Sequence, residues 1–169
     1  RELGLIKKNS TVAIALSGGK DSTVLLHLLV DLRKSLPFKL VAITIDEGIS
    51  GYRSKTLVVA KRECKKLKVK LKVVSFRGAS GKTLDTILRA DKSLLPCSVC
   101  GVFRRHLLNR AAKSVRANLL AIGHNLDDMS QTVLMNLMRN EPLRLVRFGE
   151  PLVADEKFVP RIRPLMRAP

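Results

Sequence analysis

The chain has 169 residues, with 32 lysines and arginines against 14 acidic residues and a net charge of +18. That length suits one domain with a sizeable core. The charge imbalance favours a polyanion such as nucleic acid as a partner; the alternative is a plain solvated surface. Five phenylalanines and one tyrosine are too few for an extended base-stacking platform. Three cysteines, no signal peptide and no apolar run long enough to cross a membrane indicate a reduced, cytoplasmic protein without a membrane segment.

Strand-like and helix-like segments alternate along the chain. The expected strands are residues 11–16, 40–45, 69–74 and 119–122, with 158–163 as a further candidate, and the expected helices are 22–34, 54–67, 103–115 and 127–139. Repeated strand–helix units predict an α/β fold, a Rossmann-like parallel sheet with helices on both faces. Ligands of such sheets bind beyond the carboxyl ends of the strands. The glycine-rich, basic segment 76–82 is expected to be a mobile loop.

A glycine loop follows the first expected strand and opens the first expected helix. It consists of Ala15, Leu16, Ser17, Gly18, Gly19, Lys20, Asp21 and Ser22. The adjacent glycines let the backbone turn tightly and approach a ligand, and the N–H groups of such a turn converge on an anion. The spacing matches neither a Walker A loop nor Gly-x-Gly-x-x-Gly. We predict a phosphate-binding loop; the alternative is an ordinary turn that packs helix on strand.

An acidic turn follows the second expected strand. Ile45 and Asp46 stand at its end, before Glu47 and Gly48. A carboxylate there could hold a ribose hydroxyl or Mg²⁺, while the backbone recognises adenine. The alternative is simple turn chemistry, because Asp and Gly are common turn formers. The neighbouring glycine loop favours the nucleotide.

Two carboxylates follow the strand expected over residues 119–122. Gly123, His124 and Asn125 precede Asp127 and Asp128 at the start of the next helix. Asn125 is a plausible N-cap, and acids at a helix start compensate the helix dipole. Mg²⁺, however, binds through one or two carboxylates plus substrate phosphates. We therefore predict that this loop also contributes to a nucleotide site.

A cysteine pair precedes the helix expected from residue 103. Cys97 and Cys100 have the C-x-x-C spacing that places two thiolates on one metal, whereas a structural zinc site would need a second pair and Cys64 stands alone. The N-terminus of the following helix is expected to lower the thiol pKa values. The alternatives are a half-site completed elsewhere and inert cysteines.

Four motifs in this order resemble the tRNA 2-thiolation enzymes of the PP-loop ATPase superfamily. They are S-G-G-K-D-S, I-D-E-G-I, C-x-x-C-G-V-F-R-R and G-H-N-L-D-D, and the resemblance runs from residue 12 to 165. Residues 45–52, 103–105 and 143–148 are most similar to the subgroup that modifies the wobble uridine, whereas residues 98–99 and 108–110 are more similar to the subgroup that acts in the T-loop. The resemblance implies one adenine-nucleotide α-hydrolase-like catalytic domain over residues 1–169. It also implies a fragment of a longer protein, without the family's N-terminal zinc-finger segment and C-terminal region.

The resemblance further implies an ATP-dependent tRNA sulfurtransferase. ATP and Mg²⁺ would bind at the glycine loop, Asp46, Asp127 and Asp128; the C2 oxygen of a tRNA uridine is adenylated, and sulfur then replaces it to give 2-thiouridine. In the family the sulfide is carried on a [4Fe–4S] cluster held by three cysteines. Two of these correspond to Cys97 and Cys100, and the third is expected downstream of residue 169.

Six side chains are expected to act in catalysis. They are Lys20, Asp21, Cys97, Cys100, Arg104 and Asp128. Some family members carry a proposed catalytic lysine where this chain has Arg104, and because arginine does not usefully deprotonate, charge stabilisation is the role expected here. The partners implied are tRNA and a sulfur-carrier protein or other sulfide donor, and a homodimer stays open. Alternatives are a tRNA lysidine synthetase or amidating synthetase, and a non-catalytic basic RNA-binding module.

Overall fold

The computed structural model describes residues 2–51, 53–147 and 157–169. The strands are β1 (Thr11–Ala15), β2 (Lys39–Asp46), β3 (Lys70–Ser75), β4 (Leu119–Ile122) and β5 (Arg161–Ile162). The α-helices are α1 (Lys20–Leu32), α2 (Arg53–Lys66), α3 (Phe76–Ser80), α4 (Leu84–Ala90), α5 (Pro96–Ser114) and α6 (Leu126–Met138), and the 3₁₀ helices are η1 (Glu2–Leu5) and η2 (Pro142–Arg147). The predicted α/β class is confirmed.

The strands form one parallel sheet in the order β3-β2-β1-β4-β5. Val12 of β1 lies between Leu40 of β2 and Leu119 of β4 in the register. The chain therefore builds outward from β1 to β3 and then returns across β1 to place β4. Such a reversal of strand order opens a crevice at the carboxyl ends of the two strands that flank it.

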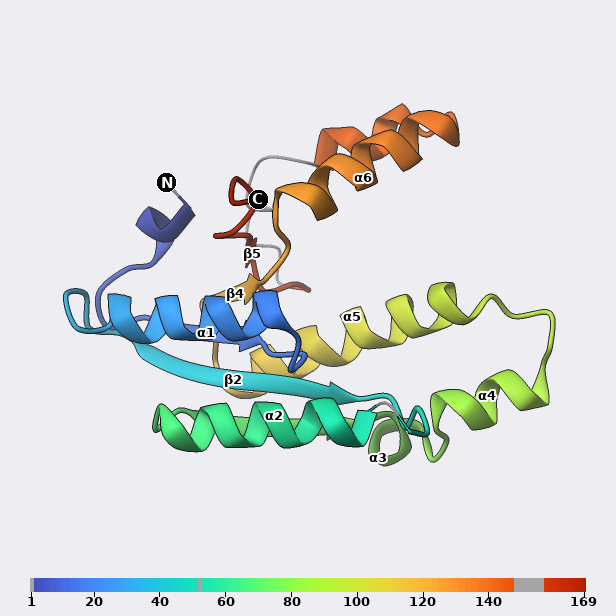
Figure 1. Ribbon diagram of the computed structural model, residues 1–169, viewed down its shortest axis with the longest axis horizontal. Coiled ribbons are helices and arrows are strands. Elements are labelled where there is room, and N and C mark those ends of the chain that lie inside the picture. The colour runs from blue at the N-terminus through green and yellow to red at the C-terminus, as the bar shows by residue number, and fades with distance from the viewer. Residues whose placement is uncertain (1, 52, 148–156) are drawn as a thin grey trace.

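Helices cover both faces of the sheet, which explains why β1 and β2 are almost continuously apolar. On one face, Leu25 and Leu29 of α1 and Ala60 of α2 pack with Val12. On the other face, the apolar stripe predicted for the helix from residue 103 packs against the sheet. Its members include Leu107, Leu108, Ala111 and Ala112. Figure 1 shows the resulting layers, with α6 extending away from them.

The segment expected to be a mobile loop is instead helical. Ser75 caps α3 by accepting a hydrogen bond from the Gly78 N–H, and Phe76 is fully buried with its ring 5.4 Å from that of Phe103. A second short helix, α4, follows a cap by Thr83 and was not predicted. Side-chain caps and one buried aromatic ring order this stretch even though its sequence is rich in glycine and lysine.

Helix α5 begins at Pro96, seven residues before the expected start. Proline suits the first turn of a helix because the N–H it lacks would have no partner there. The cysteine pair consequently lies inside the helix rather than in a turn before it. The candidate strand over residues 158–163 shortens to Arg161–Ile162.

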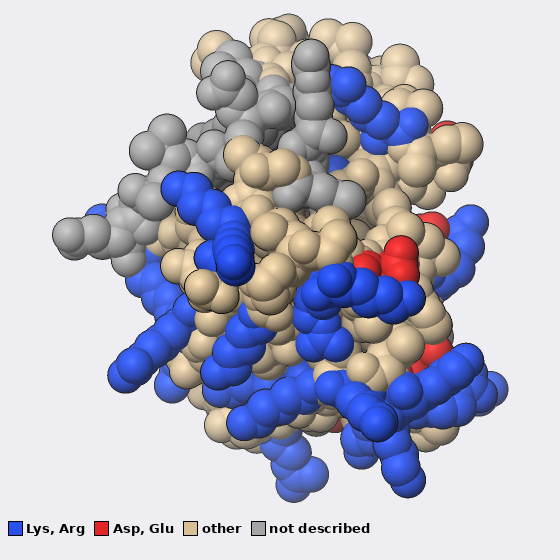
Figure 2. Space-filling view, turned by 90° about the vertical axis from the view of Figure 1, so that its left-hand side faces the viewer, with Lys and Arg blue, Asp and Glu red and all other residues tan. Residues whose placement is uncertain are grey.

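The molecule's surface charge is strongly basic. Figure 2, which faces the amino ends of the strands, shows many lysine and arginine side chains and few acidic ones. This distribution agrees with the net charge of +18. Among the helices of the described ranges, none combines the length and apolar character that crossing a bilayer requires.

Candidate active site

The carboxyl ends of β1, β2 and β4 open into a cleft of about 790 Å³. Its wall combines the glycine loop, the turn after β2, the early part of α5, the β4–α6 connection and the β5 segment. The crevice predicted by the strand order is therefore present as this cleft. Segments far apart in the sequence contribute to this one site.

The glycine loop has a backbone that requires glycine at one position. Gly18 has a φ of +86°, and a Cβ on it would lie 2.2 Å from the Thr56 carbonyl oxygen. Ser22 Oγ lies 2.9 Å from Ser17 Oγ and donates to the Gly19 carbonyl at 3.1 Å, which closes the loop on itself. The N-cap of α1 is Gly19, without a side-chain cap in the described structure. The first amides of α1 thus remain available to an anion.

A buried arginine fixes the shape of this loop. Arg53 of α2 is 5% exposed, and its Nη1 donates to the Ser17 carbonyl at 2.8 Å. Its other terminal nitrogen donates to Thr44 Oγ1 in β2. The guanidinium also forms an ion pair with Glu47 at 3.0 Å. A helix that follows β2 therefore holds the loop that follows β1.

Glu47, rather than its neighbour Asp46, is the acid of the β2 turn that lines the cleft. The Asp46 carboxylate accepts a hydrogen bond from the Gly48 N–H at 3.0 Å, which is the turn chemistry given above as the alternative. Glu47 is 3% exposed, and its second oxygen accepts from Arg104 Nε at 2.8 Å. One carboxylate thus joins α2 to α5. Sequence reasoning missed both Glu47 and Arg53, although Glu47 stands within the I-D-E-G-I motif.

The β4–α6 connection packs directly on the glycine loop. A Cβ on Gly123 would lie 3.0 Å from the Ser22 backbone nitrogen, so the two segments touch. Asn125 caps α6 in a reciprocal box: its side chain accepts from the Asp128 N–H at 3.0 Å, and the Asp128 carboxylate accepts from the Asn125 N–H at 3.1 Å. Asp128 caps the helix and also lines the cleft.

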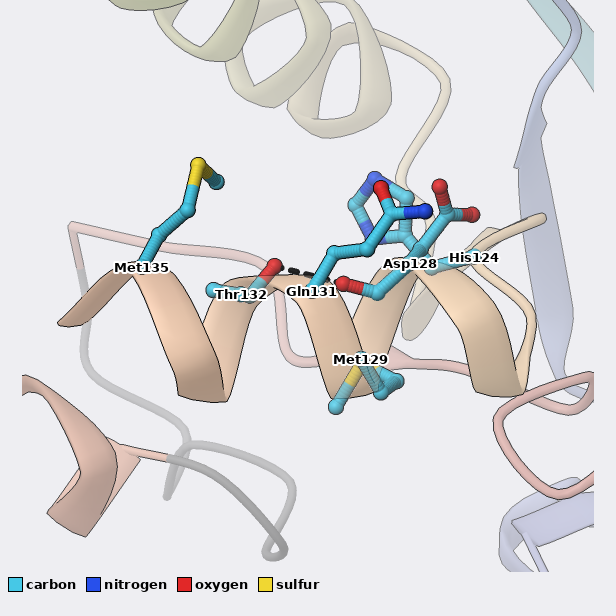
Figure 3. Close-up of a pocket in the computed structure, with 6 residues that line it drawn as sticks. All are labelled: His124, Asp128, Met129, Gln131, Thr132 and Met135. Atoms are coloured by element: carbon cyan, nitrogen blue, oxygen red, sulfur yellow. Dashed lines mark hydrogen bonds between the residues drawn. The ribbon is translucent and has the colours of Figure 1, made fainter. Parts of the chain in front are cut away.

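A smaller pocket of about 190 Å³ runs from this point along α6 (Figure 3). His124, Asp128 and Gln131 point to the same side of the helix in that view. Partial removal from water lowers the pKa of His124; Arg163 and Arg161 lower it further, and Asp128 opposes them. The imidazole is therefore biased toward its neutral form.

The cysteine pair lies in the first turns of α5, three residues apart on one helix. Cys97 is exposed and Cys100 is buried, with Arg104 Nη2 donating to Cys100 Sγ at 3.3 Å. The expected lowering of the thiol pKa is wrong for Cys100: burial raises its pKa, the proximity of Glu47 adds to this, and Arg104 opposes it. The prediction failed because this thiol sits within the helix against the core.

The donor chemistry at this position fits two ligands of an iron–sulfur cluster. Two thiols one helical turn apart can reach one metal group, and an arginine beside them suits anionic sulfur. Within the described ranges, no group of three His, Cys, Asp or Glu side chains could hold a metal ion. Cys64 is buried in the other core, between α2 and the sheet, where its pKa rises to about 11. It cannot complete the set.

The cleft gathers most of the residues predicted from sequence, but not all. Those that line it are Ala15, Leu16, Ser17, Gly19, Asp21, Ser22, Ile45, Arg104, Gly123, His124 and Asp128. Those that do not are Gly18, Lys20, Asp46, Cys97, Cys100 and Asp127. Gly101 and Arg104 do line it, so the cysteine helix and the glycine loop share one cavity.

A parallel α/β sheet with a glycine loop at its switch point defines a nucleotide-binding protein of the Rossmann-like type. The chain matches the PP-loop domain family over residues 2–169 and belongs to it, as its motifs predicted.

Two curated relatives are similar over nearly the whole chain. One is the cytoplasmic tRNA 2-thiolation protein 1 of Chlamydomonas reinhardtii, at 40% identity over 97% of this chain and 46% of the relative. The other is a "probable sulfurtransferase" of Methanocaldococcus jannaschii, at 42% identity over 98% of this chain and 50% of the relative. The chain thus spans about half the length of the curated relatives it matches.

Among solved structures, the U34-tRNA thiolase NcsA from Methanococcus maripaludis, determined with its [4Fe-4S] cluster, is similar with a TM-score of 0.87. It is 41% identical, over 98% of this chain and 54% of that one. An NH3-dependent NAD synthetase from Campylobacter jejuni shares the fold, with a TM-score of 0.54 and 20% identity over 76% of this chain and 52% of that one.

Proposed function

We propose that this chain carries the ATP-binding site of an ATP-dependent tRNA uridine 2-sulfurtransferase of the cytoplasm, with the wobble uridine as the favoured target. The observation that carries the proposal is that the glycine loop and the cysteine helix open into one cleft, through Ser17 and Asp21 on one side and Arg104 on the other. The similarity to a U34-tRNA thiolase over 98% of the chain supports it.

The first step is adenylation of the tRNA. The uridine C2 oxygen attacks the α-phosphorus of ATP, the bond to the bridging oxygen breaks, and pyrophosphate leaves. The uncapped amides of α1 are suited to stabilise the charge that develops on the leaving group. Asp21 and Asp128 line the cleft and are the candidate ligands for Mg²⁺.

The second step replaces the activated oxygen by sulfur, with AMP as leaving group. Cys97 and Cys100 would hold a [4Fe–4S] cluster together with a third cysteine from outside this chain, and that group supplies the sulfide when bound. Arg104 donates to Cys100 Sγ and is held by Glu47. Because a guanidinium stays charged, Arg104 stabilises negative charge and does not exchange protons.

The test is release of labelled pyrophosphate from ATP with unmodified tRNA. Asp21→Ala is expected to abolish release, whereas Asp31→Ala, an exposed acid on the last turn of the same helix, is expected to match the wild type. A wild-type protein that binds ATP–Mg²⁺ in calorimetry but releases no pyrophosphate with tRNA would refute the assignment. Full modification activity in a Cys97→Ser variant would favour a ligase of the same superfamily that needs no cysteine pair.

A further inference from the structure

Three arginines from two distant segments meet in the wall of the cleft. Arg105 belongs to α5, whereas Arg161 begins β5 and Arg163 follows it. Arg161 Nη2 lies 3.4 Å from the Arg105 carbonyl oxygen, to which it donates. The fold thus brings a helix and the edge strand together so that their guanidinium groups share one cavity.

These cations repel one another. The pKa of Arg161 is lowered, first because burial removes water from its guanidinium and then because Arg105 and Arg163 lie close by. Arg161 and Arg163 also lower the pKa of His124, which lies in the β4–α6 connection. A folded protein that concentrates like charges in a cavity carries an electrostatic cost, and a bound anion removes that cost.

Among the described residues that line the cleft, arginines outnumber acids. Among the described residues that line it there are five arginines and three acids. Glu47 is shared between Arg53 and Arg104, and Asp128 accepts from the backbone N–H of Asn125. The glycine loop brings its own donors for nucleotide phosphates. The arginine group is therefore additional to the phosphate loop.

We infer that Arg105, Arg161 and Arg163 form a second phosphate subsite, which binds a phosphodiester of the RNA substrate while the glycine loop binds the phosphates of ATP. This inference rests on the function proposed above. Arg105 is exposed and the other two are half-buried, so the subsite lies where a long polyanion can reach it from solvent. The planar guanidinium fork matches the oxygens of a phosphate group. A backbone contact of this kind positions the chain without reading its sequence.

The experiment measures the affinity of the protein for a fluorescent, unmodified tRNA transcript as a function of NaCl concentration. Arg105→Gln is expected to weaken binding roughly tenfold at low salt and to reduce the slope of log K against log[salt] by about one. Arg161→Lys keeps a cation at the second position and is expected to lose less than Arg161→Gln. The matched control is Arg110→Gln, an exposed arginine of α5 that does not line the cleft.

Calorimetry with ATP–Mg²⁺ separates the two phosphate sites. Unchanged ATP affinity in Arg105→Gln with weakened tRNA binding supports the subsite. Weakened ATP affinity with unchanged tRNA binding overturns the subsite, because the arginines would then bind the nucleotide. The subsite is also overturned if Arg105→Gln binds tRNA as tightly as Arg110→Gln does. A wild-type protein that binds tRNA but releases no pyrophosphate contradicts the proposed function alone, and one that does not bind tRNA overturns the subsite.

Discussion

Replacing Glu47 by glutamine tests whether one buried carboxylate stabilises the fold by pairing with Arg53, which holds the glycine loop, and with Arg104 of α5. Glu47 is 3% exposed and pairs with Arg53 at 3.0 Å and with Arg104 at 2.8 Å. Glutamine keeps the size but removes the charge, which leaves the buried Arg53 without its acid. Removing one partner of a buried pair costs about 3–5 kcal/mol. Because the Arg104 side chain is 49% exposed, water screens much of its charge. We therefore expect the free energy of unfolding to fall by about 3 kcal/mol, at the lower end of that range.

Urea unfolding measures this loss directly. With a denaturant slope of about 2 kcal/mol per molar, the midpoint should fall by roughly 1.5 M. The control is Asp31→Asn, which breaks an ion pair with Lys34 at 2.6 Å between two exposed side chains. Such surface pairs contribute at most about 1 kcal/mol. A Glu47→Gln midpoint that matches the Asp31→Asn midpoint would show that the buried pairs do not stabilise the fold, and the reasoning would be wrong.

Three further outcomes follow from the geometry. Gly18→Ala puts a Cβ 2.2 Å from a backbone oxygen at a φ of +86° and should abolish ATP binding in calorimetry. In Gly19→Ala the new Cβ meets only a side-chain oxygen at 3.4 Å, so this variant should keep the wild-type melting temperature. Equal melting temperatures for the two variants would contradict this difference between the two positions. At pH 8 iodoacetamide should label exposed Cys97, as read by mass spectrometry, and spare Cys64, whose burial raises its pKa to about 11; early labelling of Cys64 would disprove its burial. The pKa of His124 lies below its ordinary 6.5, so the unfolded chain binds the proton first as pH falls. The contribution of neutral His124 to the free energy of unfolding is therefore complete above about pH 6.5 and is lost below it. His124→Asn should flatten the dependence of the unfolding free energy on pH in that range, and an unaltered slope would argue against the lowered pKa.

The sheet could be predicted because its signal is local. The continuous apolar runs of β1 and β2 and the paired glycines after β1 specify strand, turn and helix within a few residues of one another. Helices α3 and α4 were missed because they are short and depend on caps by Ser75 and Thr83 rather than on a long apolar stripe. The early start of α5 had a sequence signal in Pro96, which is typical of a first helical turn.

The site was harder to predict because its contacts are long-range. Asp46 and Glu47 are adjacent carboxylates, and sequence does not show which of them faces the cleft and which closes the turn. Arg104 contacts Glu47 across 57 positions of the chain. The failed expectation for Cys100 has the same origin, since the burial that raises its pKa comes from packing between distant elements.

The contact between Arg53 and the Ser17 carbonyl has a practical consequence for work on this protein. Because a side chain already holds the glycine loop closed, the binding of a nucleotide need not pay the entropy of ordering that loop. In the proposed function, ATP affinity therefore reports the integrity of the α2 anchor. A cysteine variant that still binds ATP keeps this anchor, and a loss of the proposed sulfur transfer would then come from the cysteine site on α5.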